Sequence, residues 1–178
     1  MSASHVSPSV SPSASLGETL TRRFGLPAIS VRNGLTVLAA GVAATIAFDV
    51  FGQYLSPALG FAKLAPVPLA QSVIRTVTGI NSADLANVLH YITGLLFYPL
   101  GYILFARPAA KAVMPNLPWW ITASVYGVVL WAFALYAMAH LVAGLPPFLG
   151  FSGITWVALV GHVVFALVVG AVLRLRNV

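Results

Sequence analysis

Residues 119–173 read WWITASVYGVVLWAFALYAMAHLVAGLPPFLGFSGITWVALVGHVVFALVVGAVL and contain no Lys, Arg, Asp or Glu. A Gly-Leu-Pro-Pro sequence at 144–147 divides this stretch into two apolar runs. Each run is long enough to cross the hydrocarbon core of a bilayer as a helix. The first run carries His140 and the second carries His162. The stretch therefore predicts a transmembrane helical hairpin with one ionisable side chain on each arm.

The composition of the whole chain also indicates a membrane protein. Of the 178 residues, 60% are hydrophobic and only 7% are charged, whereas a soluble domain carries about a quarter charged residues. The formal net charge is +6, but the nine Lys and Arg residues lie near the ends of apolar runs. In that position they orient helices in a bilayer. We expect the lipid bilayer as a partner, with other membrane subunits or further copies of the chain beside it, and no nucleic acid.

The sequence lacks the residues that several kinds of chemistry require. The chain has no cysteine, which excludes disulfides, thiolate nucleophiles, iron–sulfur clusters and covalently attached c-type haem. Its only carboxylates are Glu18, Asp49 and Asp84, too few for carboxylate-rich metal centres or paired-carboxylate hydrolysis. It has no Walker loop, Gly-rich dinucleotide turn or nucleophile elbow. The sequence thus favours a protein that is not an enzyme, and it indicates no catalytic residue.

Four transmembrane helices are predicted, at about 34–55, 82–106, 119–143 and 152–173. Residues 1–33 are expected to form a disordered Ser/Pro-rich tail and a basic segment before the first helix. Basic residues ahead of an apolar run also fit a cleaved signal peptide, but the run 34–55 is long enough to span, which favours an uncleaved helix. The fold class is therefore all-α, an integral membrane bundle of four helices.

The connection between the first two spans carries a weaker helical signal. Apolar residues recur at helical spacing over 69–78, which predicts a short interfacial helix in the first outer loop. An ordinary packed loop is the alternative. Asn81 or Ser82 can cap the second span, and Asp84 lies in its first turn. Pro99 lies inside this span, leaves the carbonyl of Leu95 without its usual donor and predicts a kink.

The basic residues predict the orientation of the spans. Cytoplasmic ends of membrane helices are enriched in Lys and Arg. With the N-terminus inside, seven basic residues are cytoplasmic and only Lys63 and Arg75 lie outside. The seven are Arg22, Arg23, Arg32, Arg107, Lys111, Arg174 and Arg176. The sequence thus predicts a multi-pass protein of a bacterial-type inner membrane, with both termini in the cytoplasm.

Polar side chains follow one stripe on each predicted helix, and a bundle must turn such stripes away from lipid. The ionisable members all fall in the outer half of the bundle. An intramembrane carboxylate costs ~2.5–3.5 kcal/mol unless it is neutral, hydrated or paired, so Asp49 needs a partner, and a histidine on a facing helix suits it. The sequence predicts a proton-handling or ligand-binding cluster, with Tyr54 close by. Its members are Asp49, His90, His140, His162, Tyr91 and Tyr136.

Other interpretations of these residues stay open. Buried hydrogen bonds could simply fix helix registry, at about 0.6 kcal/mol each. Non-covalent b-type haem needs two histidines at matched depth, and His90 and His162 on diagonal helices meet that condition. The three histidines and Asp49 could also bind zinc or copper, although no helix carries an i, i+3 or i, i+4 histidine pair. Transport of a small solute or a proton is a further candidate, for which one bundle is small.

Short motifs in the second half of the chain resemble the YagU-like inner membrane proteins. They are FYPLGY at 97–102, Leu-Pro-Trp at 117–119, Gly-Leu-Pro-Pro at 144–147, Gly-His at 161–162 and Leu-Arg at 173–174. The similarity covers roughly 87–176. It implies a multi-span inner-membrane protein and gives weight to His162, whereas the histidine in the family's third span does not align with His140. The family has no defined biochemical activity, so the resemblance implies no substrate.

The function predicted from the sequence is a non-enzymatic accessory, proton-handling or small-ligand-binding module that uses the outer-half cluster. No resident cofactor is predicted. The alternatives are a redox carrier that binds b-type haem or a metal at His90 and His162, and a structural or interaction subunit of a larger membrane complex.

Overall fold

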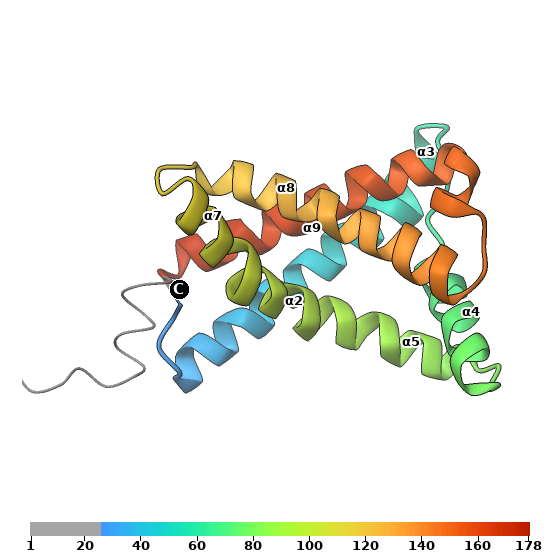
Figure 1. Ribbon diagram of the computed structural model, residues 1–178, viewed down its shortest axis with the longest axis horizontal. Coiled ribbons are helices and arrows are strands. Elements are labelled where there is room, and N and C mark those ends of the chain that lie inside the picture. The colour runs from blue at the N-terminus through green and yellow to red at the C-terminus, as the bar shows by residue number, and fades with distance from the viewer. Residues whose placement is uncertain (1–25) are drawn as a thin grey trace, which may run out of the picture.

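The computed structural model describes residues 26–178, and every regular element in this part of the chain is helical (Figure 1). Four of its helices are long and apolar enough to cross a membrane: Val31–Ala58, Ala83–Val113, Trp119–Val142 and Gly153–Leu175. The predicted all-α class with four spanning helices is therefore confirmed, and the chain has the build of a multi-pass membrane protein. Most of the predicted tail, with Arg22 and Arg23, lies outside the described residues.

Three of the spanning helices combine α-helical with π-helical stretches, in which the hydrogen bonds run from i to i+5. The first consists of α2 (Val31–Val50), η1 (Phe51–Leu55) and α3 (Ser56–Ala58). The second consists of α5 (Ala83–Ile92), η2 (Thr93–Phe97), α6 (Tyr98–Gly101), η3 (Tyr102–Ala106) and α7 (Arg107–Val113). The third consists of α8 (Trp119–Ala132) and η4 (Phe133–Val142). The fourth is α9 (Gly153–Leu175), which follows the short turn η5 (Pro147–Phe151).

The helix ends differ from the predicted spans because a helix does not stop where its apolar run stops. Ser30 caps α2 by accepting a hydrogen bond from the N–H of Asn33 at 3.2 Å, so this helix begins three residues before residue 34. Ser82 caps α5 through the N–H of Leu85. The second helix continues beyond residue 106 through α7, whose alanines and Lys111 are good helix formers in any solvent.

Pro99 lies fully buried in α6, between the π-helical stretches η2 and η3. A proline has no N–H to donate and its ring crowds the preceding turn. Just before it, the N–H of Tyr98 bonds the carbonyl of Thr93, five residues back. The backbone around Pro99 therefore widens into π-helical turns, one of the recognised ways in which a helix absorbs such a residue.

The core of the bundle is α9, which packs against α8 on one side and α2 on the other (Figure 1). The stretches η2 and α6 pack on α2. Two glycines allow close crossings. A Cβ at Gly41 would collide with the backbone of Leu95, and one at Gly127 would lie 2.6 Å from the Cα of Val163. Small residues at such crossings let membrane helices approach backbone to backbone.

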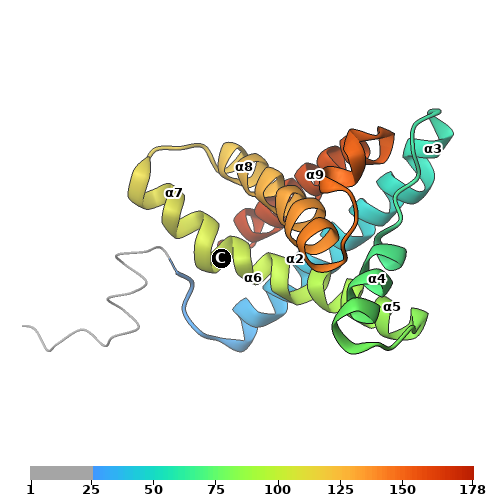
Figure 2. The same cartoon turned by 45° about the vertical axis from the view of Figure 1, so that its right-hand side comes forward.

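The two ends of the bundle are built differently. At the end that holds α7 and the C-terminus, η3 packs against both α8 and α9. At the opposite end α5 and η4 diverge, and α4 (Pro66–Thr78) packs against both of them (Figure 2). The predicted short helix after the first span is thus present, and it closes the splayed end of the bundle.

Candidate functional site

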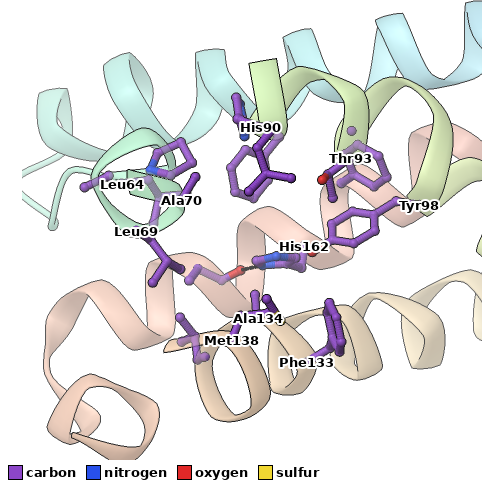
Figure 3. Close-up of a pocket in the computed structure, with 18 of the residues that line it drawn as sticks. Leu64, Leu69, Ala70, His90, Thr93, Tyr98, Phe133, Ala134, Met138 and His162 are labelled. Carbon is purple, nitrogen blue, oxygen red and sulfur yellow. Dashed lines mark hydrogen bonds between the residues drawn. The ribbon is translucent and has the colours of Figure 1, made fainter. Parts of the chain in front are cut away.

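A cavity of about 480 Å³ occupies the splayed end of the bundle (Figure 3). The stretches η2 and η4 line its two sides, α2 and α9 line its base, and α4 lines the end with Leu69 and Ala70. The lining is almost entirely apolar. Its polar side chains are Thr45, His90, Thr93, Tyr98 and His162. The arrangement resembles a small-molecule pocket, in which a few polar groups orient a ligand held by apolar walls.

His162 is the polar side chain most deeply enclosed at this cavity after Thr45, with 7% of its surface exposed. Its Nδ1 lies 2.7 Å from the carbonyl oxygen of Ala158. Because a carbonyl can only accept, Nδ1 carries the hydrogen. Burial among apolar groups without a carboxylate partner strongly disfavours a cationic ring. His162 is therefore a neutral imidazole whose Nε2 offers a lone pair, and no group in residues 26–178 donates to it.

Neighbouring aromatic rings hold the imidazole of His162 in place. The ring of Phe48 meets it edge to face, with the ring centroids 5.1 Å apart. The ring of Tyr98 lies 6.4 Å away on another side. Gly161 permits this packing, because a Cβ there would stand only 3.0 Å from the Phe48 ring. Gly161 thus leaves room for the ring of Phe48 to pack on His162 at the base of the cavity.

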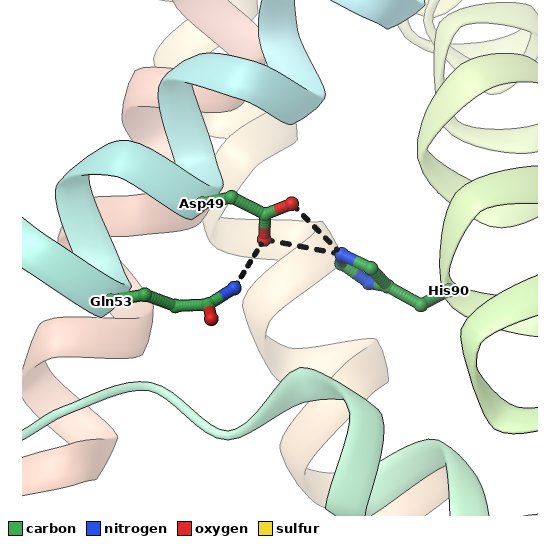
Figure 4. Close-up of polar contacts among 3 residues, drawn as sticks. All are labelled: Asp49, Gln53 and His90. Atoms are coloured by element: carbon green, nitrogen blue, oxygen red, sulfur yellow. Dashed lines mark hydrogen bonds and ion pairs between the residues drawn. The ribbon is translucent and has the colours of Figure 1, made fainter. Parts of the chain in front are cut away.

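His90 connects the cavity to Asp49 on the neighbouring helix (Figure 4). Its Nε2 lies 3.2 Å and 3.4 Å from the two carboxylate oxygens. The amide nitrogen of Gln53 donates to the same carboxylate at 3.0 Å. Both members of the pair are mostly buried, with 14% of the His90 side chain and 19% of the Asp49 side chain exposed. Asp49 itself does not line the cavity.

The structure separates His140 and Tyr136 from these residues. The Nδ1 of His140 donates to the carbonyl of Leu145 at 2.8 Å. The ring of Tyr136 lies 5.4 Å from His140 and stacks on Phe148 at 5.5 Å. Neither side chain lines the cavity. His140 instead holds the loop before η5, and Tyr136 packs on η5 itself, where Phe148, Leu149 and Phe151 adopt left-handed backbone conformations.

The remaining tyrosines of the predicted cluster lie at its edge. The ring of Tyr91 contacts His90 at a centroid distance of 5.2 Å, and about half of its surface is exposed. Tyr54 is even more exposed. The predicted set of side chains thus divides into Asp49 with His90, His162 at the base of the cavity, and His140 with Tyr136 on η4, facing the loop that follows it.

Several residues of the site were not predicted. Thr45 is 3% exposed, lines the cavity and has a buried hydroxyl without a hydrogen-bond partner in the described residues. Tyr98 lines the cavity beside His162. Both residues belong to polar stripes that the sequence shows. Phe48, Phe97 and Phe133 form aromatic walls of the cavity. The sequence does not identify them, because its pattern is the same for an apolar side chain that faces a cavity and for one that faces lipid.

Residues 26–178 contain no group of three or more His, Asp or Glu side chains placed to hold a metal ion. The three histidines and Asp49, weighed as zinc or copper ligands, do not converge. For b-type haem, His162 presents the Nε2 that an axial ligand needs. The Nε2 of His90 is directed to Asp49 instead, so the two histidines do not present matching nitrogens.

Comparisons with protein-family models, curated proteins and solved structures found no match for this chain. The resemblance to YagU-like proteins therefore stays a prediction that rests on the short motifs that carry it.

Proposed function

We propose that the protein is a non-enzymatic membrane module that binds a small, largely apolar ligand in the cavity between η2 and η4, with His162 as its polar anchor. The observation that carries the proposal is a neutral, buried histidine whose Nε2 lone pair has no donor in the described residues, at a cavity of about 480 Å³. This volume falls in the usual range of ligand sites, roughly 300–1,000 Å³.

A purely structural role explains His162 poorly. Polar side chains that fix helix registry bond across helices. The hydrogen bond of His162 goes to Ala158, four residues earlier on its own helix, and so holds no second helix. The Asp49–His90 pair, in contrast, bridges α2 and α5. The structural interpretation therefore suits Asp49 and His90, and the binding interpretation suits His162.

The cavity also favours a hydrogen-bonded ligand over haem. Haem held by two histidines would require His90 to leave Asp49 or to coordinate through Nδ1. Leaving Asp49 would give a largely buried carboxylate only the amide of Gln53 as a partner, and membrane insertion scales put the cost of an unpaired carboxylate at about 3 kcal/mol. A molecule that only donates a hydrogen bond to the lone pair of His162 needs no such change. The redox-carrier alternative is the weaker one on this geometry.

The proposal places the protein in a bacterial-type inner membrane with both termini in the cytoplasm. Support comes from the charges of the described residues. The helix ends on the side of α7 carry Arg32, Arg107, Lys111, Arg174 and Arg176, against Lys63 and Arg75 at the other end. The basic end of a multi-pass protein faces the cytoplasm.

The absence of cysteine from the sequence allows a direct test of the cavity with single introduced thiols. In lipid nanodiscs, Ala158→Cys places a thiol on the cavity, whereas Ala166→Cys places one at a similarly buried position of the same helix away from it. We expect N-ethylmaleimide to modify the Ala158→Cys variant at least tenfold faster than the Ala166→Cys variant. Naphthalene should protect the thiol at position 158 saturably. A lipid-facing control, Val160→Cys, should show no saturable protection.

Equal slow reaction at both buried positions, or protection at position 158 that never saturates, would remove the binding proposal.

The orientation in the membrane can be tested with Leu59→Cys and Asn116→Cys, which lie at opposite ends of the bundle. A membrane-impermeant maleimide applied to intact cells should label the first variant, and should label the second only after permeabilisation. The reverse pattern would overturn the assigned topology.

A further inference from the structure

We infer that the ligand is a lipid-soluble hydroxyarene, of the phenol or hydroquinol class, whose ring hydroxyl donates a hydrogen bond to Nε2 of His162. This inference rests on the proposed binding function and names the chemical class of its ligand. It depends on three features of the cavity: the polarity of its anchor, the shape of its walls and its depth in the bilayer.

The polar anchor, His162, requires a hydrogen-bond donor on the ligand. The Nδ1–H of His162 is committed to the carbonyl of Ala158 at 2.7 Å, so the free nitrogen of the neutral ring can only accept. A ligand that offers a carbonyl or an ether oxygen to this position would set two lone pairs against each other. A hydroxyl avoids that conflict, and one neutral hydrogen bond is worth about tenfold in affinity. Thr45 lines the same cavity, but its hydroxyl is buried against Gly94 and has no hydrogen-bond partner within the part of the chain that the structure describes.

The walls suit a flat ring. Five aromatic side chains line the cavity: Phe48, Phe97, Tyr98, Phe133 and Phe165. Phe48 and Tyr98 both flank the imidazole of His162, and Tyr98 meets Phe165 edge to face at 5.7 Å. Aromatic rings prefer offset-stacked or edge-to-face neighbours. A planar ring whose hydroxyl points at His162 can find such neighbours, whereas a branched aliphatic head group cannot.

The depth of the cavity in the bilayer requires a lipid-soluble ligand. His162 is the tenth residue of α9, which places it roughly 14 Å from the start of that helix at 1.5 Å per residue. His90 lies at a similar depth in α5. The cavity thus sits within the hydrocarbon region, between helices that diverge. A ligand reaches it through the bilayer, and an apolar tail on its ring can remain in lipid.

The test compares three compounds with the same ring skeleton and tail on the native chain in nanodiscs, of which the quinone matches the hydroquinone in shape. The first is a fully substituted decyl-trimethyl-hydroquinone, the second is its oxidised quinone, and the third is its dimethyl ether. Apparent affinity is read from the rise of the thermal unfolding midpoint with the mole fraction of ligand in the membrane, since a ligand that binds only the folded state stabilises it. The hydroquinone should bind at least tenfold more tightly than the ether, and the quinone should resemble the ether.

Two variants locate the effect. His162→Leu removes the acceptor and should make the three affinities equal, whereas His162→Gln keeps an oxygen acceptor and should retain part of the preference. Should the leucine variant fail to fold, the comparison of hydroquinone with ether on the native chain still decides the matter. A quinone that binds as tightly as the hydroquinone, an ether that matches it, or a preference that survives His162→Leu would overturn the inference.

The two proposals fail separately. If naphthalene still protects the Ala158→Cys variant saturably but the hydroxyl brings no advantage, the cavity binds apolar ligands and only the hydroxyarene assignment is wrong. If naphthalene gives no saturable protection, the binding function itself is wrong.

Discussion

At the scale of single residues, the same side chain, histidine, has a different environment at each of three positions. His90 pairs with Asp49, His140 bonds the carbonyl of Leu145 in a loop, and His162 keeps a free nitrogen at an apolar cavity. Sequence periodicity predicts their depth and their inward direction. It cannot predict which ring nitrogen finds a partner, because that depends on the neighbouring helices and on backbone carbonyls.

The pair of Asp49 and His90 should be energetically coupled. In a double-mutant cycle with Asp49→Asn and His90→Gln, we expect a coupling free energy between about 0.6 and about 1.7 kcal/mol, which are the average and the maximum measured for interhelical polar pairs in a membrane protein. Reversible unfolding in mixed detergent micelles provides the measurement. The matched control is Asp84→Asn with His90→Gln, because Asp84 lies a turn and a half from His90, in the capped first turn of the same helix. A coupling free energy near zero between Asp49 and His90 would show that their contact contributes nothing to stability.

At the scale of helices, the π-helical stretches η2 and η4 line opposite sides of the cavity. Such stretches often occur at functional sites. Apolar length predicts that helices exist at these positions, and the four predicted spans are close to the observed ones. It does not distinguish π-helical from α-helical turns, because the choice follows from local packing and from Pro99, not from hydropathy.

The crossing of α8 and α9 should depend on Gly127. A methyl group there would stand 2.6 Å from the Cα of Val163 and 2.7 Å from the carbonyl oxygen of His162. Overpacking of this kind costs about 1–3 kcal/mol, so Gly127→Ala should lower the thermal unfolding midpoint. Gly34→Ala is the control, since a Cβ at Gly34 meets nothing within 4 Å and alanine favours a helix over glycine. The control should leave the midpoint unchanged or raise it. A Gly127→Ala variant as stable as the control would contradict the close crossing.

At the scale of the whole molecule, the cavity results from how the bundle is assembled. Close crossings at Gly41 and Gly127 bring the helices together, η3 closes one end against α8 and α9, and α4 fills the other between α5 and η4. Composition and apolar runs predict the membrane class and the four helices. They do not predict the divergence of α5 from η4, because that angle is set by backbone contacts between residues far apart in the chain.

The central claim is that His162 presents an unprotonated Nε2 to a ligand hydroxyl in the cavity. The most direct measurement is NMR of the protein labelled with ¹⁵N-histidine, in which only four side chains give signals and His162→Gln assigns the one of interest. Without ligand, His162 should appear as the neutral tautomer with hydrogen on Nδ1. Added decyl-trimethyl-hydroquinone should shift its Nε2 resonance and leave His140 unchanged, and the dimethyl ether should not shift it. A hydrogen on Nε2 in the free protein, or an Nε2 signal indifferent to the hydroquinone, would contradict the account.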